Sequence, residues 1–168
     1  MFANLEIDID TLPKIEAVNL LPISKSYLKV IILNICIQYT ILMVSCILVH
    51  QFNNNDIASS IFWMAYFILL IVFSIHIIYS ALAFKKRGYA LRNHDIIYAH
   101  GLLTYKIVTV PIIRIQHLET KQSFIAKQFK LASLYVYTAG ESGGDLVIKG
   151  LPYKTAVELN QLLTNKIN

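Results

Sequence analysis

Two long runs of apolar residues stand in the first half of the chain. They cover Val30–Val49 and Ile61–Phe84, and neither contains a charged residue, a proline or a glycine. At about 1.5 Å per helical residue, the runs are about 30 and 36 Å long, enough to cross a hydrocarbon core about 30 Å thick. The alternative is a pair of buried helices in a soluble domain, but uncharged runs of this length are typical of membrane helices. The pattern therefore predicts a hairpin that crosses a membrane twice.

Basic residues at the edges of the two runs predict how this hairpin is oriented. The outer flanks contain five of them: Lys25, Lys29, Lys85, Lys86 and Arg87. The connection between the runs, residues 50–60, contains Asp56 and no lysine or arginine. Segments rich in lysine and arginine stay on the cytoplasmic side of a membrane. We therefore expect both termini in the cytoplasm, Asn53–Asn55 outside, and the five basic residues anchored among anionic lipid headgroups.

Beyond Arg87 the spacing of apolar residues shortens to about two, which predicts strands. Turn residues such as Asn93-His94 and the segment AGESGGD at 139–145 separate these alternating runs. About six or seven short strands of this kind indicate an antiparallel sheet or barrel. In two of the strands the alternation predicts four buried side chains: Ile113, Ile115, Leu134 and Val136.

The last stretch of the chain returns to a helical pattern. Pro152 suits the start of a helix. An apolar face follows it, made of Ala156, Leu159, Leu162 and Leu163. Strands followed by one amphipathic helix make an α+β fold, and we expect the helix to close one end of the core. The predicted organisation is a cytoplasmic N-terminal segment at 1–24, a transmembrane hairpin at 25–87 and a domain at 88–168.

Several motifs of the C-terminal half occur in the order found in a known domain. They are Val110-Pro111, Arg114-Ile115-Gln116, Gln122, Phe129 and Thr138-Ala139-Gly140. Over about Gly88–Asn168 the chain resembles the bacterial pleckstrin-homology-like domain of small membrane proteins of the YdbS type. The resemblance implies two curved antiparallel sheets of seven strands, closed by a C-terminal helix, and no known catalytic activity.

The chain departs from that pattern in one segment. Ser123-Phe124 stand where the family often has Gly-Pro, and Lys130 stands where a glycine usually follows the phenylalanine. We therefore expect the segment 123–130 to be more helical than the family's loop.

Composition and charge narrow the choice of partner. The chain is 56% hydrophobic and 15% charged, against about 45–50% and about 25% in typical soluble domains. Residues 85–168 carry 12 lysines and arginines and 5 acidic residues, a net charge of +7. A nucleic-acid-binding protein can show such an excess, but no stacking motif accompanies the charges here. Because the predicted hairpin tethers the domain to a bilayer, we expect contact with anionic lipid rather than nucleic acid. We expect this contact to be loose, because the first hairpin turn, 92–95, offers one arginine beside an aspartate and no clear headgroup pocket.

Candidate catalytic and metal-binding residues are lacking in the sequence. Cys36 and Cys46 lie ten positions apart in one predicted helix, too far for a disulfide. The five histidines show no zinc-ligand spacing, and no phosphate-binding loop or nucleophile motif is present. We expect no catalytic residue, metal or cofactor, and hence no enzyme.

Three polar residues lie inside the predicted spans. Asn34 and Gln38 are four apart and share a helix face. Gln38 and His76 both lie nine residues from a flanking lysine, at about 13 Å from the cytoplasmic boundary. We expect His76 to hydrogen-bond Gln38 or Asn34, within the hairpin or across a subunit interface. The alternative is that His76 titrates as part of a transport path.

Together with the resemblance, which implies a bacterial protein, these patterns lead us to expect a non-enzymatic binding or assembly module in the cytoplasmic (inner) membrane. We expect a multi-pass protein that acts as a homo-oligomer or with a larger membrane protein carrying similar domains. The alternative function is a small subunit of a transporter or channel that uses His76.

Overall fold

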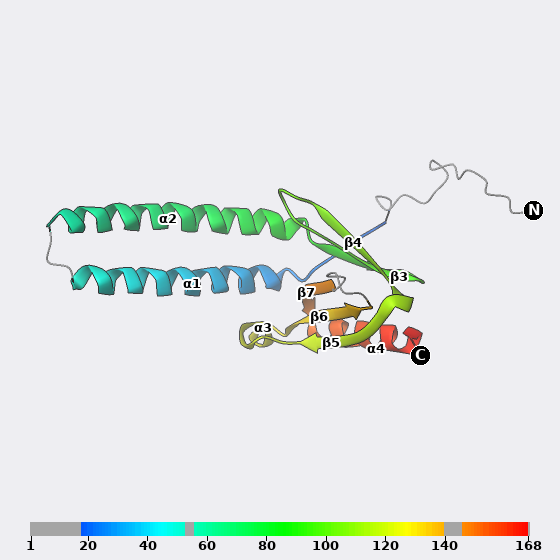
Figure 1. Cartoon of the computed structure of the whole chain (residues 1–168). Helices are drawn as coiled ribbons and strands as arrows, with labels where there is room; N and C mark the ends of the chain where they lie inside the picture. The colour runs from blue at the N-terminus through cyan, green and yellow to red at the C-terminus, as the bar shows by residue number, and fades with distance from the viewer. Residues whose placement is uncertain (1–17, 53–55, 140–145, 168) are drawn as a thin grey trace, which may run out of the picture.

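Two long antiparallel helices extend from one side of a two-sheet domain (Figure 1). The computed structural model describes residues 18–52, 56–139 and 146–167, so the loop predicted to lie outside, Asn53–Asn55, and nearly all of the turn at 139–145 fall outside the described residues. The helices are α1, Ser26–Gln51, and α2, Asp56–Lys85. Both are long and apolar enough to cross a membrane.

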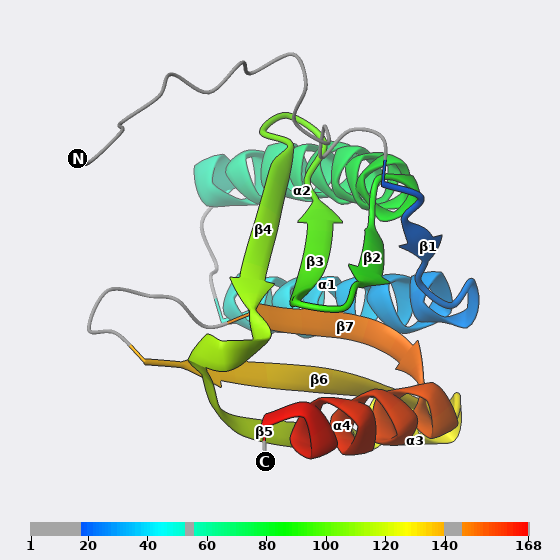
Figure 2. The same cartoon turned by 90° about the vertical axis from the view of Figure 1, so that its right-hand side faces the viewer.

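The domain beside these helices contains two antiparallel sheets. The first has the strand order β1-β2-β3-β4, with strands Leu21–Pro22, Gly88–Leu91, Asp95–His100 and Lys106–Pro111. The second has the order β5-β6-β7, with strands Ile115–Lys121, Leu131–Thr138 and Leu146–Pro152. The C-terminal helix α4, Tyr153–Ile167, packs across the second sheet (Figure 2). The predicted α+β fold of two sheets closed by a helix is confirmed.

The helical hairpin is inserted between the first two strands of the first sheet. β1 precedes α1, and β2 follows α2 after a two-residue turn. The strands pair antiparallel, with Leu21 opposite Tyr89. Ser24, between β1 and α1, donates its backbone N–H to the carbonyl oxygen of Gly150 at 3.0 Å. The residues just before the hairpin are thus bonded to both sheets.

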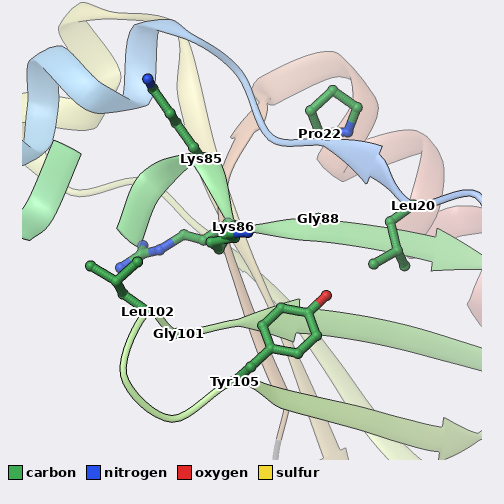
Figure 3. Close-up of a pocket in the computed structure, with 9 residues that line it drawn as sticks. Leu20, Pro22, Lys85, Lys86, Gly88, Gly101, Leu102 and Tyr105 are labelled. Carbon is green, nitrogen blue, oxygen red and sulfur yellow. The ribbon is translucent and has the colours of Figure 1, made fainter. Parts of the chain in front are cut away.

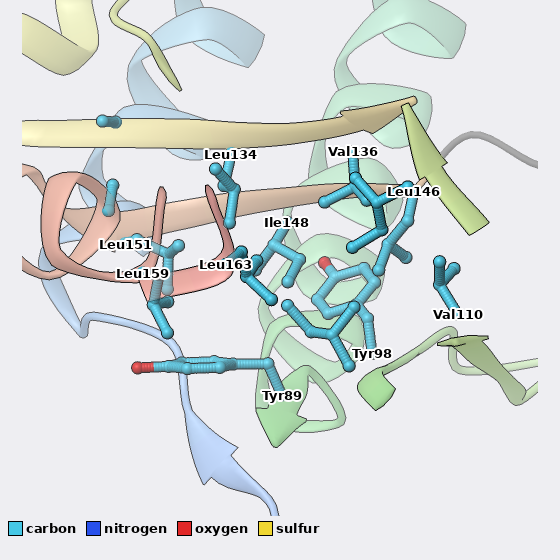
Figure 4. Close-up of a cluster of buried hydrophobic side chains, with 14 of the residues drawn as sticks. Tyr89, Tyr98, Val110, Leu134, Val136, Leu146, Ile148, Leu151, Leu159 and Leu163 are labelled. Carbon is cyan, nitrogen blue, oxygen red and sulfur yellow. The ribbon is translucent and has the colours of Figure 1, made fainter. Parts of the chain in front are cut away.

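Apolar side chains of the two sheets and α4 meet in one core (Figure 4). Its fully buried members include Ile96, Leu134, Val136 and Ile148. The prediction of burial is confirmed for Ile115, Leu134 and Val136. In α4 the predicted face is buried at three positions, Ala156, Leu159 and Leu163, whereas Leu162 is 50% exposed.

The prediction that Ile113 is buried is wrong, because this side chain is 93% exposed. A single 3-10 turn, η3, spans Ile112–Arg114 and joins β4 to β5. The turn interrupts the two-residue alternation, so Ile112 enters the core in place of its neighbour. The backbone N–H of Ile112 donates to the carbonyl oxygen of His94 at 2.9 Å, which holds the turn against the β2–β3 connection.

A short helix, α3, occupies Phe124–Gln128 between β5 and β6, in the segment where we expected helix. Its N-cap is Ser123, whose Oγ accepts a hydrogen bond from the N–H of Ala126 at 3.3 Å. Lys130, just beyond the helix, has φ +54°. Glycine adopts this left-handed conformation without a steric penalty, whereas lysine does not. α3 packs on α1 through contacts among Val30, Ala126 and Leu131.

Candidate functional site

The five predicted basic residues gather at the end of the hairpin that joins the two-sheet domain. Lys25 and Lys29 stand at the start of α1, and both are exposed. Lys85 ends α2, and Lys86 and Arg87 form the turn into β2. Lys85 and Lys86 are exposed, while Arg87 is half-buried. The fold therefore concentrates positive charge where helices and sheets meet.

Three of these residues line a pocket of about 400 Å³, which we call the first basic pocket (Figure 3). Lys85, Lys86 and Arg87 come from the α2–β2 connection, and the loop joining β3 to β4 supplies Gly101, Leu102 and Tyr105. Leu20 and Pro22 line it from the N-terminal side. No acidic residue lines this pocket among the described residues. The positive charges of Lys85, Lys86 and Arg87 favour an anion in this pocket, and the apolar side chains that line it favour an anion with an apolar portion.

Arg87 differs from the two lysines because it points into the domain. Its guanidinium carbon lies 5.8 Å from the centre of the Tyr27 ring, a cation–π contact. Its Nε is buried and has no hydrogen-bond partner in the described part of the chain. Burial, together with the positive charges of Arg87 and Lys106, lowers the pKa of His100 below its usual value. Burial also raises the pKa of the Tyr98 hydroxyl, against the opposing influence of Arg87.

A second basic pocket, also of about 400 Å³, lies beside α3. Its lining residues are Gln122, Lys127, Lys130, Pro152, Tyr153 and Lys154. The backbone N–H of Tyr153 donates to the carbonyl oxygen of Lys130 at 2.9 Å, which joins the start of α4 to the end of α3. Lys154 also lies 3.9 Å from Glu158 in an exposed pair, which contributes little. The sequence does not predict this pocket, because its lysines come from different elements of the fold. In the sequence they contribute only to the excess of positive charge in residues 85–168.

The polar residues of the two long helices are arranged differently from our prediction. Nδ1 of His76 lies 3.5 Å from the hydroxyl of Tyr39, whose ring also packs on Phe73. Asn34 instead donates to the carbonyl oxygen of Val30 at 2.8 Å, one turn back in its own helix, and Gln38 is exposed. The prediction that His76 bonds Gln38 or Asn34 within the hairpin is therefore wrong, and Tyr39 takes that place. A contact of His76 with these residues across a subunit interface stays a prediction.

The described residues contain no group of three or more histidine, cysteine or acidic side chains that could hold a metal ion. Cys36 and Cys46 are free thiols. What the arrangement offers is binding surface: two cationic pockets beside one end of an apolar hairpin.

Comparison with known families agrees with the fold. A family model described as the bacterial PH domain matches residues 29–167. The chain belongs to the bacterial PH domain family. The two-sheet domain described above is its PH domain, and the match begins inside α1, so it includes most of the hairpin. No curated protein and no solved structure matches the chain. Membership supports a role as a binding or assembly module.

Proposed function

We propose that this protein is a non-enzymatic binding or assembly module anchored in the bacterial cytoplasmic membrane. A two-span hairpin holds its PH domain against the cytoplasmic face. The observation that carries the proposal is the direct joining of an exposed apolar hairpin to two basic pockets at one end.

Exposed apolar side chains on both helices support the membrane anchor. Ile41, Trp63 and Phe67 are each more than three-fifths exposed, at 64%, 68% and 65%. In water, apolar surface of this kind costs about 25 cal/mol per Å² left unburied. In a bilayer the same side chains contact acyl chains and the cost disappears.

The contrast between the two ends of the hairpin supports the orientation. The end that joins the PH domain carries all five flanking basic residues, and the other end carries none between residues 50 and 60. At that other end His50, Phe62, Trp63 and Tyr66 form an aromatic cluster, with 3.2 Å between His50 Nδ1 and the Tyr66 hydroxyl. Aromatic belts of this type are enriched where helices leave a bilayer. Basic flanks stay in the cytoplasm, which supports a cytoplasmic position for the PH domain.

An apolar groove between the helices supports assembly with another membrane-spanning helix. The groove has a volume of about 310 Å³, and Cys36, Tyr39, Thr40, Leu70 and Phe73 are among its lining residues. Small side chains such as Cys36 and Thr40 let a neighbouring helix approach closely. The partner is a second copy of this chain or a larger membrane protein that carries similar domains.

Topology reporters and purification test the proposal. An alkaline phosphatase fusion, active only outside the cytoplasm, should be active at Asn54 and inactive after Asn168. The reverse pattern would overturn the orientation. Purification of the tagged full chain in a mild detergent should recover a complex rather than a monomer, and a protein that remains monomeric at all concentrations contradicts an assembly role.

The His76–Tyr39 pair favours the alternative function, a subunit of a transporter or channel, because two titratable side chains meet inside a span. His76→Gln distinguishes the two functions, since glutamine keeps a polar side chain but cannot titrate. A binding module should keep both its assembly and its cellular phenotype. Intact assembly with complete loss of phenotype would favour the transport function.

A further inference from the structure

Three apolar side chains of the PH domain are more than four-fifths exposed in its described part. They are Leu103 at 86%, Ile113 at 93% and Phe124 at 81%. We propose that Leu103 and Phe124 insert into the bilayer on two sides of the hairpin, and that each adjacent basic pocket binds phosphate-bearing headgroups of anionic phospholipids. This inference rests on the proposed membrane anchor and adds the surface by which the PH domain itself contacts lipid.

The position of α3 places Phe124 at the level where the first span begins. Val30, the first residue of the uncharged run in α1, lies in one buried cluster with Ala126 of α3. Ile125 also packs against this cluster, whereas Phe124 projects free of it. Figure 1 shows α3 at the hairpin side of the second sheet, beside the start of α1. A bilayer that surrounds α1 from Val30 onward therefore reaches Phe124.

The loop joining β3 to β4 places Leu103 at the corresponding level of the second span. Its neighbours Leu102 and Tyr105 line the first basic pocket together with Lys85, the last residue of α2. Gly101 turns the chain with φ +105°, and a Cβ there would lie 2.0 Å from the carbonyl oxygen of Thr104. This tight turn needs glycine, so the loop has a defined shape. In Figure 1 its tip lies next to the end of α2.

Charge around the two tips suits an anionic membrane. Lys85 and Lys86 line the first basic pocket together with Leu102, the neighbour of Leu103. Lys127, Lys130 and Lys154 line the second together with Gln122, two residues before Phe124. No acidic residue lies in 101–106 or 122–130. An apolar side chain surrounded by lysines matches the boundary between acyl chains and anionic headgroups.

Ile113 provides a built-in comparison because it lies at the other end of the sheets. η3 joins the end of β4 to the start of β5, whereas the Leu103 loop precedes β4 and α3 follows β5. The three side chains are similarly exposed, but only Leu103 and Phe124 face the hairpin side. The proposal therefore predicts that Ile113 stays in water.

Site-specific fluorescent probes on the full chain test this arrangement. Cys36 and Cys46 are first replaced by alanine, and one new cysteine is introduced at position 103, 113 or 124. A fourth cysteine, at Leu70 in the middle of α2, reports on the hairpin itself. Each variant is labelled with an environment-sensitive dye and reconstituted in nanodiscs of phosphatidylcholine and phosphatidylglycerol. Quenching by neutral acrylamide in the water phase is then measured.

Probes at 103 and 124 should show blue-shifted emission and lose most of the quenching that the probe at 113 shows. If they are quenched as strongly as the probe at 113, while the probe at 70 stays protected, the proposal is overturned and the membrane anchor stands. If the probe at 70 is quenched as well, the anchor itself fails and this inference fails with it.

Two matched changes test the headgroup part of the proposal without altering the apolar tips. Lys127→Gln with Lys154→Gln should increase quenching at 124 and leave quenching at 103 unchanged. Nanodiscs of phosphatidylcholine alone should increase quenching at both positions. If neither change alters quenching, anionic headgroups do not bind there. Circular dichroism of each variant verifies that helix and strand content is retained, and Phe124→Trp on a Trp63→Phe background repeats the depth measurement without a dye.

Discussion

The hairpin and the PH domain use the same apolar residue types with opposite exposure. In the hairpin, large side chains such as Ile41, Phe67 and Leu70 are more than half exposed. In the PH domain, Ile96, Leu134 and Ile148 are fully buried. In the first region no charged residue interrupts the apolar runs, whereas in the second, charged and turn residues divide the apolar residues among short strands. The difference shows that the spacing of apolar residues, more than their amount, indicates which solvent each region meets.

The hairpin and the PH domain are nevertheless not independent units, because residues of the hairpin pack into the PH domain core where the two regions meet. Ile23, between β1 and α1, is buried in the PH domain core. Tyr27 of α1 and Phe84 of α2 pack against the same core. A fragment that begins at Gly88 lacks all of these contacts, so stability is best measured on the full chain.

The largest expected difference between the regions is at two leucines. Leu134→Ala should lower the free energy of unfolding by about 2–5 kcal/mol, because it leaves a cavity in a closed core. Leu48→Ala removes a side chain of α1 that is 51% exposed and should change the free energy of unfolding by no more than about 0.5 kcal/mol. Denaturant titration of the full chain in detergent micelles, followed by near-ultraviolet circular dichroism, measures both. Equal effects would contradict the division between an exposed hairpin and a buried core.

A glycine at the junction should show the next largest effect. Gly150 has φ +82°, and a Cβ there would lie 2.4 Å from Cγ of Tyr27. Gly150→Ala should lower the free energy of unfolding by more than the roughly 1–2 kcal/mol that a left-handed residue costs, since Tyr27 must also move. The same denaturant titration measures this loss. The control is the double variant with Tyr27→Gly, because the Cβ that alanine would keep at position 27 also lies only 2.8 Å from a Cβ at position 150. If Gly150→Ala costs as much on that background as alone, the contact between β7 and α1 is not the cause.

A smaller effect distinguishes two adjacent isoleucines at the turn after β4. Ile112 is 4% exposed and Ile113 is 93% exposed. Ile112→Val should cost about 0.5–1.5 kcal/mol of unfolding free energy, whereas Ile113→Val should cost almost nothing. Thermal unfolding of the two variants under identical conditions gives the comparison. A larger loss of stability for Ile113→Val than for Ile112→Val would support the strand register predicted from alternation and contradict the 3-10 turn η3.

The smallest expected effect concerns the polar pair inside the hairpin. Hydrogen bonds between membrane helices contribute only about 0.6 kcal/mol on average. Tyr39→Phe and His76→Phe should each weaken hairpin stability by about that amount, and the double variant by little more than either alone. Denaturation of the single and double variants in micelles, analysed as a double-mutant cycle, gives the coupling free energy between the two side chains. Full additivity would mean that the 3.5 Å contact between Tyr39 and His76 contributes nothing.

Sequence patterns predicted the long elements well, because their signals are repeated many times. The two apolar runs, the alternating strands and the amphipathic C-terminal helix all appear in the structure. The sequence did not predict β1, because a strand of two residues is too short to show the alternation of apolar and polar positions. Ile113 was misplaced because a 3-10 turn shifts the alternation by one position. Local geometry of this kind depends on tertiary contacts such as the hydrogen bond from Ile112 to His94.

The candidate site was only partly predictable for two different reasons. The cluster Lys85–Arg87 is contiguous in sequence, so its location was evident, whereas the lysines of the second basic pocket converge only after folding. For His76, the sequence indicates how deep the residue lies along the helix, but not which side of the helix its partner in α1 faces. Adjacent helical residues point about 100° apart, so Tyr39 faces α2 although Gln38 lies at almost the same depth.

The placement of the hairpin between β1 and β2 affects how the chain reaches its folded state. Pairing Pro22 with Gly88 closes a loop of more than sixty residues, which for a flexible chain carries a large entropic cost. Two helices already packed side by side hold their ends about 8–10 Å apart and remove most of that cost. We therefore expect the sheet to complete after the hairpin has formed. If the hairpin spans a membrane as we propose, a chain that crossed it only once would place β1 and β2 on opposite faces. The sheet could then not form, and Ile23 would be absent from the core.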